Sequence, residues 1–342
     1  MSFGMSFGMH QAASFAVRFR PMGPWRFGPD SGARDRVDLI YHSDALYSAV
    51  CSAMSQLGLA ERWLEATATA ASPAVRFSSF FPFSGETMFV VPPRNLWPPP
   101  ESAKVRYKSA HFVPLSVIQT LLSEQAIDEE RWAVDGESEC LVPSNQGRAP
   151  FRVTLRSSAG VDRVQHAGVA VHSTACLEFA RGAGLWTIVQ FADEAAASQW
   201  EAPVRSALLL LADSGFGGER SRGWGRSEAP EWQPWTPPQA AASEQPGERA
   251  HWLLSLYTPA ENDSVDWKRG SYVTVSRRGR IESSARWGEP KVPTTMIAEG
   301  SVLLASNEPL GSASNVAPEG FPHPVYRAGF AVTIPIPWRV AA

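Results

Sequence analysis

The chain of 342 residues has few cysteines, few lysines and no long hydrophobic run. Its three cysteines (Cys51, Cys140 and Cys176) lie too far apart for a metal-ligating spacing, and their odd number is typical of a reducing compartment. The longest aliphatic stretch, residues 207–212, is far shorter than the ~20 residues that cross a bilayer. The first residues lack the basic and apolar regions of a secretory signal. We therefore expect a soluble cytoplasmic protein without a metal.

Arginine supplies almost all the positive charge. Of the 31 basic residues only 4 are lysines. The base composition of the genome is one explanation. The guanidinium group is also suited to bidentate phosphate contacts and to stacking on bases. A net charge of −3 argues against general coating of nucleic acid but permits a local basic groove.

A segment without helical or strand periodicity divides the chain. Residues 231–250 are rich in proline, alanine, glutamate and glutamine, which is typical of a linker. We therefore predict an N-terminal domain over residues 1–230 and a C-terminal domain over residues 251–342.

The N-terminal domain alternates strands with helices. Apolar side chains and arginines alternate over residues 15–20, which predicts a half-buried strand. An apolar stripe over residues 43–58 predicts a helix, with Ser43 as N-cap and Asp44 at its positive end. Further strands are predicted at 75–80, 87–91, 151–155, 169–179 and 184–191, and further helices at 114–122 and 193–213.

The C-terminal domain consists of strands and loops with little helix. Apolar and alternating runs predict strands within 251–257, 271–284, 301–306 and 326–336. The strand–helix–strand order of the first half indicates a ferredoxin-like α+β domain, and we expect a similar sheet in the second half.

The most informative segment follows the helix at 193–213. It combines glycines, arginines and aromatic residues, namely Gly215, Phe216, Gly217, Gly218, Arg220, Ser221, Arg222, Gly223, Trp224, Gly225 and Arg226. Glycine permits positive φ and a close approach of the main chain to a ligand. Amides of such a loop can bind an anion, arginines can neutralise phosphates, and Phe216 or Trp224 can stack on bases.

The order of elements around this loop excludes a mononucleotide site. Dinucleotide and Walker-type loops follow a strand and open a helix, so that the helix N-terminus faces the phosphate. Here a helix precedes the loop and a strand follows it, and the Walker lysine is missing. A plain connection seldom combines these residues. We therefore interpret the loop as a site for a polyanion.

Together with other segments, this loop resembles a known family. A long helix, then G-x-G-G-x-R-S-x-G-x-G, then a strand is typical of the RAMP proteins of CRISPR systems. The chain resembles, almost end to end, the subunit that caps the 5′ end of the guide RNA in type III-A (Csm) complexes. The segments that agree are HSDALYSAV (42–50), FSSFFPF (77–83), VVPPR (90–94), AHFVPLSVIQTLL (110–122), VDR (161–163), LSLYTP (254–259), GSYVTVSRRGRI (270–281), MIAEGSV (296–302) and HPVYRAGFAVTIPI (323–336).

The resemblance implies two ferredoxin-like, RRM-related domains, no cofactor and no nuclease activity. It implies binding of the crRNA 5′ handle, docking of the large signature subunit, contact with an adjacent backbone RAMP subunit, and indirect contact with target RNA. Family members also project an extended thumb beside the guide. We place the thumb at about residues 92–110, with Arg94, Lys104, Arg106 and Lys108 as RNA contacts.

Other basic and polar residues complete the predicted RNA-binding set. Arg277 and Arg278 follow a strand of the second domain, where a solvated strand end or an acidic partner face is the alternative. Arg163 is an RNA contact or the partner of Asp162 in an internal ion pair. The set outside the thumb is Arg18, Arg26, His42, Ser43, Arg163, Gly215, Phe216, Gly217, Gly218, Arg220, Ser221, Arg222, Gly223, Trp224, Gly225, Arg277 and Arg278.

Two alternatives to a non-catalytic type III-A subunit remain open. A repeat-cleaving endoribonuclease would use His42 as its general acid or base, because imidazole titrates near neutral pH. The second alternative is the corresponding capping subunit of type III-B complexes. Backbone subunits of these complexes cut target RNA with a loop aspartate, and Asp30, Asp35 and Asp38 follow the first strand here.

Overall fold

The computed structural model describes residues 13–29, 31–99, 102, 105–145, 149–161, 169–240, 249–283, 285–286 and 288–338. Asp30, Lys104, Asp162 and Arg163 lie outside these residues, as does part of the predicted linker. None of the helices within the described ranges is both long enough and apolar enough to cross a membrane.

The first half of the chain builds one antiparallel sheet. Its strands lie in the order β11-β1-β10-β3-β4-β5, and β2 also pairs with β10. The outer faces of this sheet are covered by helices. The strands are β1 (Ser14–Phe19), β2 (Val75–Phe77), β3 (Phe81–Ser84), β4 (Thr87–Val90), β5 (Val113–Pro114), β10 (Ala183–Phe191) and β11 (Glu231–Pro234).

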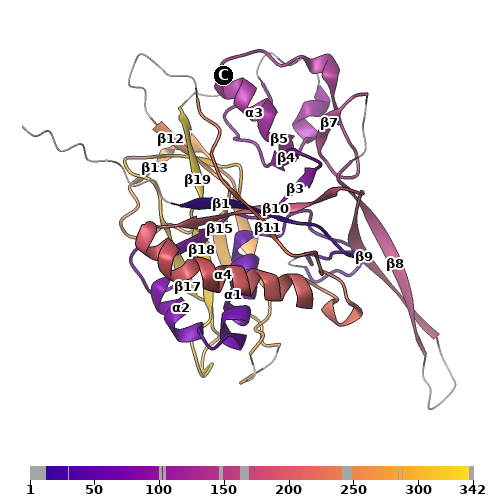
Figure 1. Cartoon of the computed structure of the whole chain (residues 1–342), viewed down its shortest axis with the longest axis vertical. Helices are drawn as coiled ribbons and strands as arrows, with labels where there is room; N and C mark the ends of the chain where they lie inside the picture. Colours follow the sequence, from indigo (N-terminus) through magenta and orange to yellow (C-terminus); the bar gives the residue numbers. More distant parts are fainter. Residues whose placement is uncertain are drawn as a thin grey trace, which may run out of the picture.

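Three helices lie on one side of β1 and β10, and α3 lies on the other (Figure 1). The three are α1 (Ser43–Gln56), α2 (Ala60–Ala66) and α4 (Glu194–Ser214), and α3 spans Leu115–Leu122. α1 packs against α4 and α2, and it also contacts β18 of the second half. The helices predicted from apolar stripes are confirmed because each buries its stripe against the sheet or a neighbouring helix.

The second half consists of strands. A four-stranded sheet has the order β13-β16-β12-β19, and two hairpins, β14–β15 and β17–β18, lie beside it. Residues 249–283, 285–286 and 288–338 contain no helix, so the expectation of a second ferredoxin-like unit is not confirmed. The strands are β12 (Arg249–Leu253), β13 (Val265–Ser271), β14 (Thr274–Arg277), β15 (Thr294–Ile297), β16 (Val302–Ala305), β17 (Gly311–Asn315), β18 (Tyr326–Phe330) and β19 (Thr333–Pro337).

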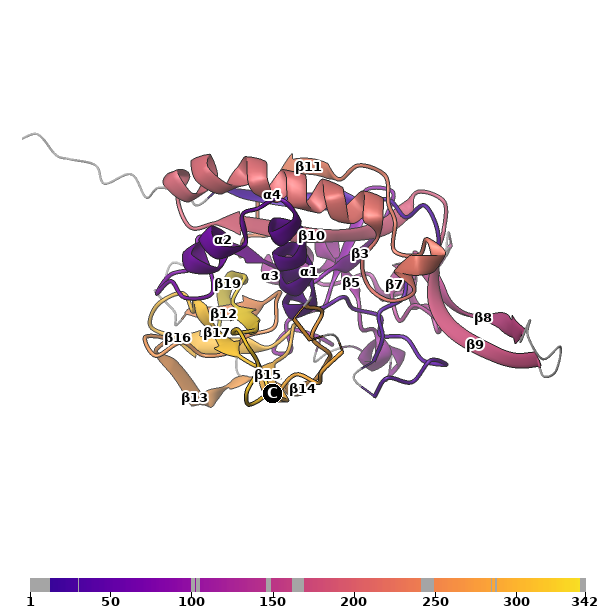
Figure 2. The ribbon, with the colours of Figure 1, turned by 90° about the horizontal axis from the view of Figure 1, so that it is seen from below.

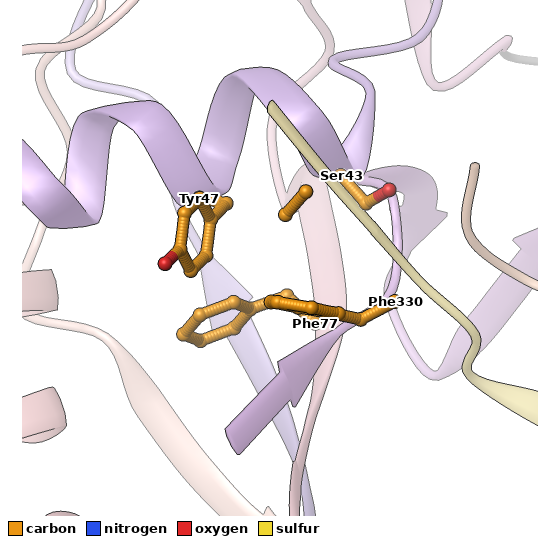
Figure 3. Close-up of a pocket in the computed structure, with 5 residues that line it drawn as sticks. Ser43, Tyr47, Phe77 and Phe330 are labelled. Carbon is orange, nitrogen blue, oxygen red and sulfur yellow. The ribbon is translucent and has the colours of Figure 1, made fainter. Parts of the chain in front are cut away.

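The two halves share a continuous hydrophobic core. At their junction the Tyr47 ring of α1 meets Phe330 of β18 edge to face, with ring centroids 5.5 Å apart, close to Phe77 of β2 (Figure 3). The cavity between these rings is about 10 Å³, which is barely the space of one water. The junction is therefore packed like the interior of a single domain.

The predicted linker is partly wrong. Its first residues, Glu231–Pro234, form β11 and pair with β1 along Phe15–Arg18. The local sequence has no strand periodicity, but β1 has an open edge whose backbone groups need partners, and pairing with that edge selects the extended form.

The predicted thumb is also placed wrongly. Residues 105–109 form a short 3-10 helix, η1 (Val105–Ser109), and Trp97 stacks on the buried Tyr107 with centroids 5.3 Å apart. The projecting element is instead the hairpin of β8 (Phe151–Val161) and β9 (Val169–Phe179), which extends away from the body (Figures 1 and 2). Aromatic packing folds the proline-rich stretch back onto the protein, whereas the hairpin is anchored at its base, where Phe151 and Phe179 pack into the core. The remaining elements between β5 and β8 are η2 (Glu129–Arg131), β6 (Trp132–Val134) and β7 (Leu141–Pro143).

Candidate nucleic-acid interface

The glycine-rich loop begins where α4 ends. Gly215 closes α4 with φ 80°, and Gly217, Gly223 and Gly225 also have positive φ. A Cβ at Gly217 would overlap the carbonyl oxygen of Arg26, and one at Gly225 would overlap that of Phe216. The glycines are thus required because the loop packs against its own backbone and against the segment after β1.

About half of the amides of the loop are used within the protein. Gly218 donates to the Arg26 carbonyl at 2.8 Å and Gly225 to the Pro24 carbonyl at 3.0 Å. The amides of Arg222 and Gly223 close the short 3-10 helix η3 (Arg220–Arg222). The predicted row of backbone donors is therefore only partly used within the protein: the glycines build a fixed scaffold, and exposed side chains of the loop are available to a ligand.

The two aromatic residues of the loop are core residues. Phe216 is 2% exposed, and its ring stacks on Phe80 and meets Trp25 edge to face at 4.7 Å. Trp224 is 8% exposed. A ring buried on this scale cannot stack on a base, so the prediction of base stacking by Phe216 and Trp224 is wrong.

The exposed cations of the loop are Arg220, Arg222 and Arg226, and Arg226 is bound to Asp213 of α4. Arg220 pairs with Glu282 of the second half at 2.5 Å, and Arg222 pairs with Glu219 at 3.1 Å. Both arginine side chains are about two-fifths exposed. Exposed ion pairs contribute little stability, so these guanidiniums can exchange a carboxylate for a phosphate at small cost. Ser221 lies exposed between them.

Arg26 and Arg18 have internal roles instead. Arg26 is 6% exposed and donates to the carbonyl oxygens of Ala33, Arg34, Arg36 and Ala175. Burial lowers the pKa of its guanidinium. Arg18 is 4% exposed, pairs with Glu86 at 3.3 Å and lies over the Phe83 ring. Their predicted RNA contacts are therefore corrected, because neither guanidinium reaches the surface.

Residues 42–44 join the two halves of the protein. The N-cap of α1 is His42, so Ser43 is the first helical residue and not the predicted cap. The Ser43 hydroxyl accepts the amide hydrogen of Leu256 at 3.0 Å. Asp44 faces Arg277 and Arg327 of the second half, each at 3.1 Å, and all three side chains are at most one-tenth exposed. Ser43 and Arg277 are therefore interface residues, which corrects their predicted RNA contacts.

His42 forms a further contact across this junction. Its Nδ1 lies 2.8 Å from the carboxylate of Glu299, which also accepts the Ser79 hydroxyl. Burial lowers the pKa of His42, but the Glu299 carboxylate outweighs burial and raises it overall. Burial raises the pKa of Glu299, and the imidazolium in turn lowers it overall. The geometry therefore holds His42 as a charged partner of Glu299.

We expect the His42–Glu299 pair to make stability depend on pH. A histidine with a raised pKa stabilises the fold below its unfolded pKa of 6.5, and a glutamate with a lowered pKa does so above 4.5. Between pH 4.5 and pH 6.5, the unfolding free energy of the wild type should therefore exceed that of His42→Gln by about 1.5–3 kcal/mol. The difference should be smaller at pH values above and below this range. Urea titrations across pH would measure it. The exposed His323→Gln is the control, and a difference that is constant with pH would contradict the pairing.

The remaining predicted contacts are exposed but dispersed. Arg94, Arg106, Lys108 and Arg278 all have exposed side chains. The glycine-loop arginines lie on a scaffold that is joined to β9 of the hairpin through the hydrogen bonds of Trp25. The structure thus brings the loop and the hairpin together.

Trp25, which sequence reasoning missed, ties the loop to the hairpin. Its amide donates to Leu177 of β9 at 3.0 Å, and its indole donates to the carbonyl of Arg226 at 3.0 Å. In Figure 2 the short helical turn after α4 lies near the base of β8 and β9. The position of Trp25 in a loop of glycines, prolines and arginines contains no signal of this role.

The hairpin has a basic face and an apolar face, and sequence reasoning missed both faces. Arg152 and Arg156 share Glu178 on one face, while Leu155 and Val171 are 60% and 67% exposed on the other. Strand alternation places them so, because successive side chains point to opposite faces. The strands themselves were predicted, and the alternation of Arg152 and Arg156 with Val153 and Leu155 was the signal that could have identified the two faces.

Comparisons with known proteins agree with this arrangement. Residues 247–336 match the family model of the CRISPR Csm4 C-terminal domain. The C-terminal part of the chain is thus similar to the Csm4 C-terminal domain. A comparison with curated proteins gives no significant match.

The Csm4-like fold extends beyond the matched domain. One similar solved structure is a Csm3-Csm4 subcomplex of a type III-A CRISPR-Cas interference complex, with a TM-score of 0.63, 14% identity and coverage of 95% of this chain and 100% of that chain. A second is a Csm1-Csm4 cassette in complex with pppApA, with a TM-score of 0.57, 18% identity and coverage of 96% and 98%. The fold of these two structures is therefore shared over nearly the whole length of this chain.

Proposed function

We propose that this chain is a non-catalytic subunit of a type III-A CRISPR complex that binds the 5′ handle of the crRNA. The match to the Csm4 C-terminal domain and the end-to-end similarity to Csm4 folds support membership of such a complex. The observation that supports RNA binding is the pair Arg220 and Arg222, exposed on a rigid loop beside a projecting hairpin.

The RNA contacts are the exposed part of the loop and the hairpin. Arg220, Arg222 and the Ser221 hydroxyl meet phosphates, because they are the polar side chains that the scaffold turns outward. Arg152 and Arg156 of the hairpin add cations on its basic face. The hairpin takes the role of the thumb, and its apolar face, with Leu155 and Val171, lies beside the first guide bases.

The partners follow from the structures of related proteins. Csm4 is found with Csm1 in one solved cassette and with Csm3 in one solved subcomplex. We infer that this chain joins the large signature subunit to the adjacent backbone RAMP subunit in the same way. Its own chemistry is binding, because His42, the candidate acid–base residue, is engaged by Glu299.

Replacing both loop arginines tests this function. We expect Arg220→Ala/Arg222→Ala to weaken handle binding for every RNA sequence and to reduce the salt dependence of log K by about 1–2, since each lost phosphate contact contributes about 0.7 for single strands. Fluorescence anisotropy with labelled handle RNA at several salt concentrations would measure both. Arg62→Ala/Arg131→Ala removes two exposed arginines from α2 and η2 and is the matched control.

Two results would contradict the proposal. The first is an unchanged handle affinity of the loop variant at low and moderate salt. The second is cleavage of repeat RNA by the purified chain that disappears in His42→Ala, because it would make the chain an endoribonuclease.

A further inference from the structure

An exposed aromatic cluster lies at the far edge of the second sheet. Trp267, Tyr272 and Val273 are 40%, 38% and 42% exposed, and they lie within seven positions of one another. Large apolar side chains gathered at a surface usually mark a binding site, because exposing them to water is unfavourable. This edge is separate from the glycine loop and the hairpin (Figure 2).

A bulge in β13 turns Trp267 outward. β13 is the edge strand of its sheet, and its pairing with β16 shifts register between Val265 and Gly270. A bulge leaves the intervening residues out of the ladder and changes the direction of their side chains. Trp267, Lys268 and Arg269 are in this bulge.

The position of Trp267 is fixed by its neighbours. Its ring is stacked with the buried Tyr257 at 26°, with centroids 6.5 Å apart. The Tyr257 hydroxyl donates to Asp263 at 2.9 Å, and Asp263 also accepts backbone amides such as that of Gly311 at 2.9 Å. Tyr272 meets Trp267 edge to face at 5.5 Å and donates its hydroxyl to the Trp267 carbonyl at 3.1 Å. Because its neighbours already fix the Trp267 ring, the ring loses little conformational freedom when a ligand binds.

The charge around Trp267 suits an anion. Lys268 and Arg269 follow it directly, and Asp266 precedes it, so the exposed side chains next to the ring carry two positive charges and one negative charge. The carboxylate of Asp263 is engaged by the Tyr257 hydroxyl and by backbone amides. The Asp266 carboxylate accepts the amide of Lys268 at 3.0 Å and so shapes the bulge. A planar ring beside cations is the arrangement with which proteins bind single-stranded nucleic acid, through stacking on bases and attraction of phosphates.

We propose that Trp267 is a stacking platform for an unpaired RNA base, with Lys268 at the adjacent phosphate. The inference rests on the proposed RNA-binding function and adds a second contact region to it. A base is favoured over a protein side chain because it extends the Tyr257–Trp267 stack with another planar ring, and because its phosphate matches the local charge.

Trp267→Ala tests the platform with the full-length chain and two probes. The first is a labelled single-stranded oligouridylate, and the second is an oligonucleotide of the same length with abasic residues. We expect Trp267→Ala to weaken binding of the first about 5- to 100-fold, the range that base–aromatic stacking supplies. Trp267→Phe should restore most of it, and the abasic probe should bind the wild type and Trp267→Ala equally. Leu209→Ala, which removes an exposed apolar side chain of α4, is the control.

The outcomes separate this inference from the proposed function. If Arg220→Ala/Arg222→Ala weakens binding while Trp267→Ala leaves it unchanged, the platform is wrong and the loop assignment stands. An equal loss on both probes would show that Trp267 does not stack on bases. If Trp267→Ala retains RNA affinity but releases a partner subunit from the assembled complex, the surface binds protein and the proposal is overturned. A wild-type chain that binds neither probe overturns the platform, and one that also fails to bind the labelled handle RNA overturns the proposed function.

Discussion

Asp44→Asn is expected to lower the free energy of unfolding by about 3–5 kcal/mol. Asp44 is buried. Its carboxylate accepts two hydrogen bonds from Arg277, at 3.1 and 3.2 Å, and one from Arg327 at 3.1 Å. Burial raises the pKa of Asp44, but the two guanidiniums outweigh it and hold the pKa below its ordinary value. Removing the negative charge leaves two buried cations facing an uncharged amide, and such charges are costly without a counter-ion.

Urea unfolding at neutral pH would measure this effect as a lower midpoint. Asp213→Asn is the matched control, because Asp213 pairs with Arg226 while 78% of its side chain is exposed. We expect the control to change the free energy of unfolding by at most about 1 kcal/mol. A loss in Asp44→Asn as small as that of the control would show that the cluster does not join the two halves.

Phe216→Ala is expected to cost about 3–5 kcal/mol of unfolding free energy, the usual range for a buried phenylalanine. The Phe216 ring lies among Trp25, Phe80, Tyr41 and Phe19, with centroids between 4.7 and 5.8 Å away. The substitution leaves a cavity below the glycine loop, so the loop arginines lose part of their support.

Comparing stability with RNA affinity distinguishes a core role from a stacking role for Phe216. Phe216→Leu keeps most of the packing volume and should cost less than about 1.5 kcal/mol. A surface stacking residue would instead show a loss of RNA affinity in Phe216→Ala with an unchanged urea midpoint. That result would restore the original prediction from the sequence.

The two variants together connect the fold to the proposed function. The glycine loop touches the second half through Arg220 and Glu282, and the halves are joined beneath it by the Asp44 cluster. The relative position of the loop and the second-half surface therefore depends on buried charges that never meet RNA.

Much of the fold could be predicted because its signals are local. The strand at 15–20 and the helices at 43–58, 114–122 and 193–213 follow from apolar spacing over a few residues, and the structure contains an element at each. β11 could not be predicted, since its only reason to be extended is the edge of β1. The thumb was misplaced because proline content predicts irregular structure but not the aromatic contact of Trp97 with Tyr107 that folds it back.

By itself the sequence determined the order of elements, the glycine-rich loop and the motifs that identify the C-terminal domain. Tertiary structure alone decided which residues of those motifs face solvent. Asp44 meets Arg277 and Arg327 across separations of 233 and 283 residues, and no local pattern distinguishes such an arginine from one that binds phosphate. The physical reason is that a guanidinium pairs equally well with a carboxylate or a phosphate, so its partner is set by the surroundings into which the fold places it.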